Sequence, residues 1–405
     1  MAKRILFLTP QLPYPPQQGT AIRNYNLIRQ VAKRHEVHLL SFAGTPASAA
    51  DLSPLRDLCV ALNVVPAPHR SNWKRLLTVL ASPRPDIAHR LSSPLFTQKL
   101  EEVLKESKPD VIQVEGLEMA QYGLWARQLA GEELLLVYDA HNAEYLLQQR
   151  IFEADARRPR RWLGAFYSFI QWQKLRRYEA LVCRQAQRVI ACSAADAKAL
   201  ARLIPGLEAI MIPNGVDTQY YRPHVVAALP LGAQAMVFTG KMDFRPNVDA
   251  VLWFCTEVLP IIRHVLPDAH FYIVGKNPHP RLAPLRNLPG VTITGFVEDV
   301  RPYIAAAAVY VVPLLTGGGT RLKVLEAMAM GKAVVSTTLG CEGIHVASGQ
   351  DVVLADEPSD FAAQVLALLQ NGARREQLGR AARTFVERYF DWNIVAAPLE
   401  QAYAD

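Results

Sequence analysis

The chain has 405 residues, of which 50% are hydrophobic and 20% charged, a composition typical of a globular protein and unlike that of a disordered or collagenous chain. Its length predicts two domains, each large enough to bury its own core. Five widely spaced cysteines without a C-x-x-C pair exclude a zinc-finger pattern and favour a reducing compartment. The first apolar run is too short for a signal peptide, and no stretch matches the roughly 20 residues of a membrane span, so we expect a cytoplasmic protein.

The net charge of +7 is concentrated in residues 150–188, which hold ten Lys or Arg and three Asp or Glu. The rest of the chain carries 34 residues of each sign, so nucleic-acid binding is not expected. Trp162, Phe166 and Phe169 recur in this segment at helical spacing, which predicts an amphipathic helix with a basic rim. The segment is expected either to bind an anionic membrane surface peripherally or to cover the first domain's sheet, with its charges in solvent.

Short apolar runs alternate with helix-length segments along the first half of the chain. A helix is expected over 21–33, and strands are expected at 5–8, 37–42, 111–114, 134–138 and 189–192. Strands this apolar, separated by helices, indicate a parallel sheet that is covered on both faces.

A turn-forming cluster at 213–217 interrupts this pattern, which then restarts. The second set of expected strands is 237–239, 271–274, 291–294, 309–312 and 333–336. We therefore predict an α/β fold of two doubly wound Rossmann-like domains facing across a cleft. The predicted domains are 1–212 and 218–385, with a C-terminal helix over 386–405 that packs back on the first.

A glycine-rich turn at 317–319 is the segment with the clearest chemistry. The glycines let the backbone approach a ligand, and Thr320 is expected to cap the helix that follows. Arg321 and Lys323 add cations to the exposed amides of a helix start, a combination that suits a diphosphate. Glu326 shares a helix face with Lys323 and is placed to accept hydrogen bonds from a ribose diol. The alternative is a plain loop followed by a surface ion pair.

The sequence resembles the GT-B glycosyltransferases, specifically the large retaining family 4 type. The segments that carry this resemblance are 15–20, 192–196, 213–217, 295–300 and 323–335. The resemblance implies transfer of a sugar from a nucleotide-diphosphate donor, with retention at the anomeric carbon and with neither a metal nor a cofactor. The pattern also resembles transferases of polysaccharide assembly associated with exosortase systems. That narrower likeness implies a glycan or polyprenyl-linked acceptor and a role in exopolysaccharide or cell-surface glycan synthesis.

Within the resemblance, Glu326 matches the second Glu of an E-x7-E motif and is expected on the donor ribose. Gly318 stands where the first Glu is usual, near the donor sugar, so the backbone of Gly318, Gly319 and Thr320 is expected to face the donor instead. Lys241 retains a cation that is usual after the first strand of the second domain. Pro246 and Asn247 stand where a Lys-Gly pair is usual.

Further residues complete the expected site. Arg245, Phe296 and Val297 are expected on the donor. Gly19, in a Pro-rich turn before the first helix, is expected to present its amide to the transferred sugar, unless it forms a simple strand-to-helix turn. His141 follows the carboxyl end of a strand and resembles a histidine that reaches the sugar, although a lone His is more often structural.

Asp139 and Glu144 either orient His141 or cap the following helix. The expected chemistry is loss of a diphosphate, so Arg321 and Lys323, with His141, are expected to act in catalysis by stabilising charge and holding the reactants. Two alternatives stay open. One is a nucleotide-sugar 2-epimerase or a phosphorylase on the same plan, and the other is a non-enzymatic nucleotide-sugar sensor, suggested by the missing first Glu.

Overall fold

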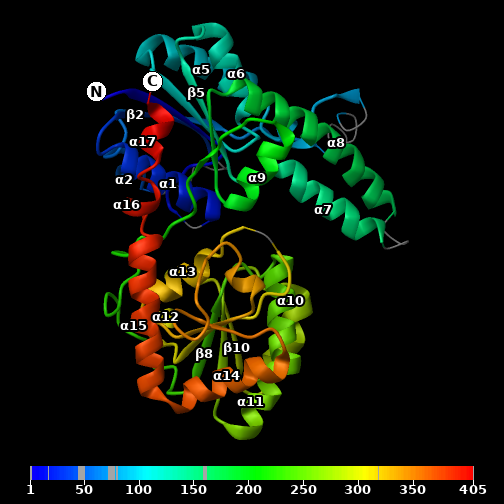
Figure 1. Cartoon of the computed structure of the whole chain (residues 1–405), viewed down its shortest axis with the longest axis vertical. Coiled ribbons are helices and arrows are strands. Elements are labelled where there is room, and N and C mark those ends of the chain that lie inside the picture. Colours follow the sequence, from blue (N-terminus) through cyan, green and yellow to red (C-terminus); the bar gives the residue numbers. More distant parts are fainter. Residues whose placement is uncertain are drawn as a thin grey trace. The chain divides into compact units, whose positions relative to one another are not determined.

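The computed structural model describes residues 2–16, 18–43, 51–71, 78, 81–157, 162–317 and 319–404. The chain divides into two units (Figure 1). Unit 1 is Met1–Pro213 with Ala396–Asp405, and unit 2 is Asn214–Val395. Each unit contains one sheet of parallel strands with helices on its faces, which confirms the predicted fold class of two Rossmann-like α/β domains.

The sheet of unit 1 has seven parallel strands in the order β3-β2-β1-β4-β5-β6-β7. The strands are β1 (Arg4–Thr9), β2 (Glu36–Ala43), β3 (Ala61–Pro66), β4 (Val111–Glu115), β5 (Leu135–Ala140), β6 (Arg188–Ala191) and β7 (Ile210–Met211). The five strands predicted in this half are confirmed to within about two residues. Strand β1 lies between β2 and β4, and its residues 5–9 are buried because helices cover both faces.

The helices of unit 1 follow the strands in a βαβ succession. They are α1 (Gly19–Val31), α2 (Ser53–Arg56), α4 (Asp86–Arg90), α5 (Pro94–Ser107), α6 (Ala120–Ala130), α7 (Glu144–Ala156), α8 (Trp162–Gln185), α9 (Ala194–Leu203) and α17 (Leu399–Tyr403). The hydroxyl of Ser93 accepts a hydrogen bond from the Phe96 amide and caps α5, and Ser193 caps α9 in the same way. Helix α1 begins two residues before the predicted start.

The sheet of unit 2 has six parallel strands in the order β10-β9-β8-β11-β12-β13. They are β8 (Ala235–Thr239), β9 (His270–Val274), β10 (Val291–Gly295), β11 (Val309–Val312), β12 (Val334–Ser336) and β13 (Val353–Leu354). The strand order reverses between β8 and β11, as it does between β1 and β4 in unit 1. In open α/β sheets, ligands bind beyond the carboxyl ends of the strands at such a point.

Longer helices of unit 2 cover this sheet, and short helical turns connect them. They are α10 (Arg245–Trp253), a π-helical turn (Phe254–Val258), α11 (Leu259–Val265), a 3-10 helix (Pro280–Asn287), α12 (Arg301–Ala306), α13 (Leu322–Ala329), a 3-10 turn (Leu339–Cys341), α14 (Pro358–Gln370), α15 (Gly372–Tyr389) and α16 (Trp392–Val395). The residues from 386 onward do not form one helix, since α15 ends at Tyr389 and α17 belongs to unit 1. Across the described ranges, no helix is long and apolar enough to cross a membrane.

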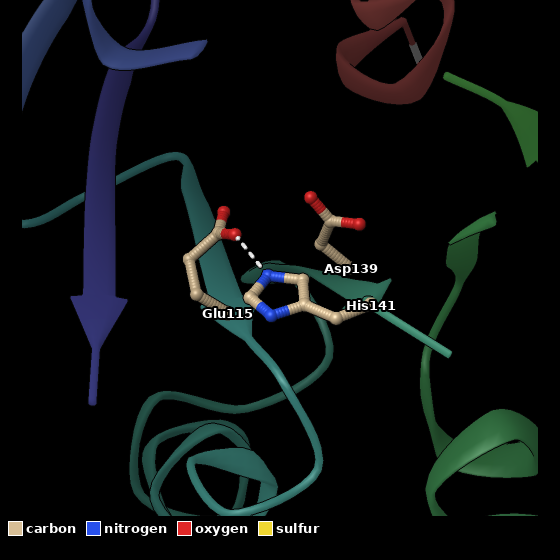
Figure 2. Close-up of side chains that lie close together, drawn as sticks. All are labelled: Glu115, Asp139 and His141. Atoms are coloured by element: carbon tan, nitrogen blue, oxygen red, sulfur yellow. Dashed lines mark hydrogen bonds and ion pairs between the residues drawn. The ribbon is translucent and has the colours of Figure 1, made fainter. Parts of the chain in front are cut away.

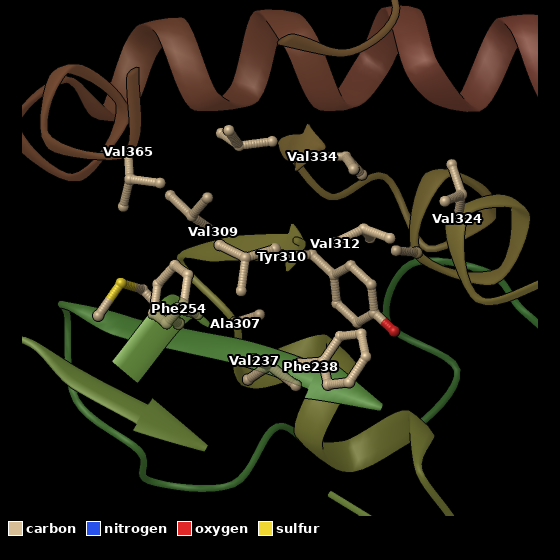
Figure 3. Close-up of a cluster of buried hydrophobic side chains, with 14 of the residues drawn as sticks. Val237, Phe238, Phe254, Ala307, Val309, Tyr310, Val312, Val324, Val334 and Val365 are labelled. Carbon is tan, nitrogen blue, oxygen red and sulfur yellow. The ribbon is translucent and has the colours of Figure 1, made fainter. Parts of the chain in front are cut away.

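The core of unit 2 fixes the ends of β8 and β11 relative to each other. Phe238 of β8 and Tyr310 of β11 both belong to this core (Figure 3). The Tyr310 hydroxyl is 2.6 Å from the hydroxyl of Thr239, the last residue of β8, and accepts a hydrogen bond from its amide. This buried contact holds the carboxyl end of β8 beside β11.

The ends of β8 and β9 approach so closely that only glycine fits there. A Cβ atom on Gly275 would lie 1.6 Å from the carbonyl oxygen of Gly240. A Cβ on Gly240 would in turn lie 2.7 Å from the ammonium of Lys323. The two glycines therefore let the turn after β8 reach the start of α13.

The predicted cap of α13 is wrong. The helix begins at Leu322, its N-cap residue is Arg321, and no side chain caps it. Thr320 lies one residue too early, and Arg321 takes the N-cap position with a cationic side chain instead of a hydroxyl.

Candidate functional site

Lys323 is the central cation of the site in unit 2. It lies in the first turn of α13, which follows β11. Its ammonium donates a hydrogen bond to the side-chain oxygen of Asn247 at 2.9 Å and lies 4.0 Å from the centre of the Phe238 ring. The negative face of an aromatic ring attracts a cation, so both contacts hold the ammonium at the carboxyl end of the sheet.

Asn247, which sequence analysis did not assign to the site, joins the two loops that build it. Its amide nitrogen donates to the carbonyl oxygen of Lys241 at 2.9 Å, while its amide oxygen accepts from Lys323. The turn after β8 is thereby tied to the start of α13. The sequence did contain a signal for Asn247. Pro246 and Asn247 stand where the resembled family usually has a Lys-Gly pair, and this departure marks Asn247 as a residue to examine in the binding loop.

Burial controls the charge of this site. The pKa of Lys323 is lowered to about 7, chiefly by burial and to a smaller extent by the charge of Arg321, while the carboxylate of Glu326 opposes the shift. Burial also raises the pKa of Glu326, against the hydrogen bond from Tyr221 and the charge of Lys323. Both shifts favour the neutral forms of these side chains. Keeping Lys323 and Glu326 charged in the site without a ligand therefore costs free energy. An anion bound beside Lys323 would offset that cost.

Arg321 lies against the glycine-rich turn. A Cβ on Gly317 would lie 2.9 Å from a terminal nitrogen of the Arg321 guanidinium, so the absence of a side chain there makes room for it. Burial lowers the pKa of Arg321, and the charge of Glu342 partly offsets this. Gly319 has a φ of +79°, in the left-handed region that favours glycine. Gly318 is outside the described residues.

The other residues predicted on the donor lie on the same unit, but several have partners of their own. The ammonium of Lys241 is half-exposed and lies 3.3 Å from a carboxylate oxygen of Asp243. Arg245 is exposed and pairs with Asp249 of its own helix at 3.4 Å. Phe296, just beyond β10, is 62% exposed, whereas Val297 packs against the core. Of these residues, Lys241 is connected to Lys323, because Asn247 bonds both the backbone carbonyl of Lys241 and the ammonium of Lys323.

His141 of unit 1 lies just beyond β5 and belongs to a network of buried charges (Figure 2). Its Nε2 is 3.0 Å from a carboxylate oxygen of Glu115, the last residue of β4. Burial by itself lowers the pKa of His141, but the hydrogen bond to Glu115 and the charge of Asp139 outweigh it, so the net pKa is raised. His141 therefore tends to be a cation here.

Glu115, absent from the sequence prediction, is the residue that orients His141. Its side chain is fully buried, and its other oxygen accepts from the amide of Gln113 at 2.6 Å. Asn24, with its amide nitrogen facing the carboxylate, donates to Glu115 at 2.8 Å. The Tyr403 hydroxyl of α17 donates to Gln113, so residues near the C-terminus support the same network. Burial raises the pKa of Glu115 despite its partners.

Asp139 does not hydrogen-bond to His141 as expected, because Arg23 binds it. The guanidinium of Arg23 donates to both carboxylate oxygens of Asp139 at 2.9 Å, and a third nitrogen donates to the carbonyl of Ile212 at 2.9 Å. Both charged side chains are nearly fully buried. This bidentate pair joins α1, β5 and the segment before unit 2.

The expected capping of α7 by Asp139 or Glu144 is also wrong. Glu179 of α8 accepts hydrogen bonds from the amides of Glu144 and Tyr145 at 3.0 and 2.9 Å. Burial raises the pKa of Glu179 to about 8, against these two bonds. Gly19 is the first residue of α1, and a Cβ there would meet nothing within 4 Å.

Glu115, Asp139 and His141 form a group of three possible metal ligands, with one ligand atom each within 4.8 Å of one another, among the described residues. The donor set does not suit a cation, however. Arg23 occupies both oxygens of Asp139, and the partners of Glu115 are His141, Gln113 and Asn24. A metal ion would have to displace a buried guanidinium, so the cluster is a self-neutralised charge network.

Comparison with known families assigns both parts of the chain. Residues 18–220 match the model of Glycosyltransferase Family 4, and residues 233–371 match that of Glycosyl transferases group 1. The first match covers just over half of the 405 residues. The chain therefore belongs to the family 4 type of group 1 glycosyltransferases, in which both units carry the Rossmann-like fold of the GT-B class.

Among characterised relatives, the phosphatidyl-myo-inositol mannosyltransferase of Mycobacterium tuberculosis is 30% identical over 213 residues, or 49% of this chain and 54% of that protein. The glycogen synthase of the same organism is 26% identical over 268 residues, covering 62% of this chain and 61% of that one. The chain thus matches about half to three fifths of the length of these relatives.

Solved structures cover nearly the whole chain at lower identity. The Anabaena protein HepE in complex with UDP and glucose has a TM-score of 0.66 at 18% identity, with 98% of both chains covered. Sucrose-phosphate synthase from Thermosynechococcus elongatus has a TM-score of 0.71 at 18% identity, with 99% and 98% covered. At this identity the likeness establishes the fold.

We expect Arg23→Gln to destabilise the protein by about 3–5 kcal/mol, because it leaves Asp139 buried without its cation. Urea unfolding followed by circular dichroism measures the loss. Arg4→Gln is the matched control, since the Arg4–Asp110 pair is also formed with a strand residue of unit 1 but is about 40% exposed. Equal small losses in the two variants would contradict the role given to the buried pair.

Proposed function

We propose that this protein is a glycosyltransferase that moves a sugar from a nucleotide-diphosphate donor to a glycan or lipid-linked acceptor, with retention and without a metal. Membership of the family supports the reaction class. The observation that carries the proposal is the arrangement of Arg321, Lys323 and Glu326 at the start of α13, at the strand-order reversal of unit 2.

In this proposal the start of α13 holds the donor's diphosphate. Lys323 is buried against Phe238 and Asn247 with its pKa lowered to about 7, and a diphosphate would favour its charged form. Arg321 and the amides of the glycine-rich turn contribute further donors. Glu326, hydrogen-bonded by Tyr221, accepts from the hydroxyls of the ribose.

The reaction breaks the bond between the anomeric carbon and the diphosphate, so negative charge develops on the leaving group. Arg321 and Lys323 stabilise that charge, since fixed cations in a poorly solvated site act strongly on it. His141, oriented by Glu115 and favoured as a cation, donates a hydrogen bond to the transferred sugar in unit 1. The proton of the acceptor hydroxyl leaves with a phosphate oxygen of the donor.

The acceptor class is part of the proposal. The name of the mycobacterial relative refers to phosphatidyl-myo-inositol, and HepE was solved with UDP and glucose. These names support a lipid-linked acceptor and a UDP-sugar donor, with exopolysaccharide or surface-glycan synthesis as the pathway. Product analysis with UDP-sugars separates transfer from the alternatives. A 2-epimerase or phosphorylase converts or cleaves sugar without this acceptor, and a sensor binds without turnover.

Substitutions in the donor site test the assignment. We expect Arg321→Ala and Lys323→Ala each to lower kcat/KM at least tenfold, about 1.4 kcal/mol of transition-state stabilisation. Glu326→Ala is expected to weaken binding of the donor nucleotide. A thermal-shift screen with UDP-, GDP-, ADP- and dTDP-sugars identifies the donor for these assays, since a ligand of the folded state raises Tm.

Arg380→Ala is the matched control for these variants, because Arg380 is a well-exposed cation of unit 2 that pairs with Glu376 of its own helix at 3.5 Å. It is expected to bind and turn over like the wild type. Wild-type kinetics in all three site variants would overturn the donor site.

The pKa of Lys323 predicts a pH dependence. Above pH 7 the Lys323 side chain of the free protein loses its proton. When a diphosphate is bound, Lys323 stays protonated, so binding in this pH range takes up a proton. The terminal phosphate of UDP is already ionised in this range. Affinity for UDP, measured by calorimetry, is therefore expected to fall roughly tenfold between pH 7 and pH 8.5. Lys323→Met should bind weakly with little pH dependence, and an equal slope in both proteins would contradict the assignment.

We also propose that unit 1 attaches peripherally to an anionic membrane through the hairpin of α7 and α8 (Figure 1). The segment in which we predicted an amphipathic helix forms helix α8, whose Ala165, Gln171 and Leu175 are buried. Trp162 and Phe166 are 65% and 64% exposed near the tip of the hairpin. Exposed aromatic side chains beside basic residues are typical of helices that bind a membrane surface.

Co-sedimentation with vesicles tests this attachment. We expect binding to phosphatidylglycerol vesicles and not to phosphatidylcholine vesicles, since each basic residue near an anionic surface contributes about 1 kcal/mol. Trp162→Ala with Phe166→Ala should weaken it, and so should neutralising Arg157 together with Arg158, Arg160 and Arg161, the last three of which are outside the described residues. Leu181→Ala is the control, because Leu181 is 45% exposed on the same helix but far from the tip. Unchanged binding in both variants would refute the role of the hairpin.

A further inference from the structure

A second cationic site lies in unit 1, away from the network around His141. It is a cavity of about 330 Å³ between the segment that follows β3 and helix α4. The polar residues that line it include His69, Arg70, Thr78, His89 and Arg90. Its volume is at the lower end of the range for small-molecule sites, and its lining is basic.

Arg70 is held in the wall of this cavity. Its side chain is 17% exposed, and one terminal nitrogen donates to a carboxylate oxygen of Asp86 at 2.7 Å. The other terminal nitrogen donates to the hydroxyl of Thr78. These bonds fix the orientation of the guanidinium, and its remaining N–H groups are the donors that Arg70 can offer to an oxyanion.

Several other cations surround His89. Burial lowers the pKa of His89, and the charges of Arg70, Arg84 and Lys174 lower it further, while Asp86 opposes them. Arg90 is exposed at the mouth of the cavity. Cations gathered at one concave site repel one another, and a bound anion relieves that repulsion. Lys174 comes from α8, so the cluster is built from three separate segments.

The cavity lies within electrostatic reach of the residues after β5. Burial raises the pKa of Glu144, and this rise is opposed by a hydrogen bond from Asn142 at 3.3 Å and, more weakly, by the charge of Arg90. Asn142 follows His141 directly. Because β3 and β5 are parallel strands of one sheet, the segments after both emerge at the same edge. The cavity and the residues after β5 therefore lie on the same side of this sheet.

We propose that this cavity binds the phosphate or diphosphate group of a phosphorylated acceptor and so positions the hydroxyl that receives the sugar. This inference rests on the proposed transfer reaction and adds its acceptor chemistry. Phosphate oxygens are strong acceptors for several N–H donors at once, and Arg70 and Arg90 supply such donors. A neutral glycan would bring no negative charge to this cavity, where the carboxylate of Asp86 is already paired with Arg70.

Binding of inorganic pyrophosphate tests the cavity apart from turnover. The protein carries Lys323→Ala, which weakens the donor site of unit 2, and the ring signals of His89 are followed by NMR and assigned with a His89→Gln variant. Pyrophosphate is expected to shift these signals and raise the pKa of His89. Arg90→Gln, at an exposed position, and Arg70→Gln should each weaken this binding at least about tenfold. Arg56→Gln, exposed on α2 of the same unit, is the control.

A second arm identifies the source of the phosphate. Phosphatidylcholine vesicles with and without a polyprenyl phosphate are compared, and pyrophosphate is added as competitor. Binding that needs the polyprenyl phosphate, is displaced by pyrophosphate and is lost in Arg90→Gln assigns a lipid-linked acceptor. A response to soluble pyrophosphate alone assigns a soluble phosphorylated acceptor. Both outcomes support the phosphate site.

The proposal is overturned if pyrophosphate leaves the His89 signals unchanged, or if Arg90→Gln and Arg70→Gln bind it as the control does. Its failure is distinct from failure of the transfer reaction. If pyrophosphate does not bind but the enzyme transfers sugar to a neutral acceptor, only the phosphate site is refuted. If pyrophosphate binds in an Arg90-dependent way but the protein has no transferase activity, only the proposed reaction is refuted.

Discussion

Burial of the parallel strands on both faces is the constraint from which the rest of this protein follows. Such strands are apolar along their length, so polar chemistry is confined to the segments where they end. In unit 1, Glu115 is the last residue of β4 and Asp139 the last but one of the neighbouring β5, and both carboxylates are fully buried. A buried carboxylate without a partner is costly, and Arg23 and His141 supply the partners. The same constraint brings β8 and β9 together at Gly240 and Gly275 in unit 2.

The two units treat charge in opposite ways. The network of unit 1 pairs each buried carboxylate with a guanidinium, an imidazole or an amide, so it is close to neutral without a ligand. In unit 2, burial lowers the pKa of Lys323 to about 7 and raises the pKa of Glu326. A site of that kind gains most from an anion that restores the cation. This contrast favours the site around Lys323 for the phosphates of a donor and the network around His141 for hydrogen bonds to neutral hydroxyls.

Helix α8 connects several features of unit 1. Its Glu179 caps α7, and its Gln171 accepts a hydrogen bond from the amide of Asp86 at the start of α4. Lys174 contributes charge to the cavity around His89. The exposed Trp162 lies at the other end of the same helix. One helix thus connects the hairpin with α7, the start of α4 and the charges around His89.

The fold class and ten of the strands could be predicted from the sequence alone. So could the glycine-rich turn and its neighbours Arg321, Lys323 and Glu326. Hydrophobic patterning and turn composition are local properties of a chain, which is why they can be read without the structure. It missed β3, a partly exposed edge strand, and the two-residue strands β7 and β13, whose patterns are too short to recognise. It also missed Asn247, Glu115 and Arg23. Lys323 binds Asn247 across 76 residues and Arg23 binds Asp139 across 116, so only tertiary packing decides which buried charge meets which partner.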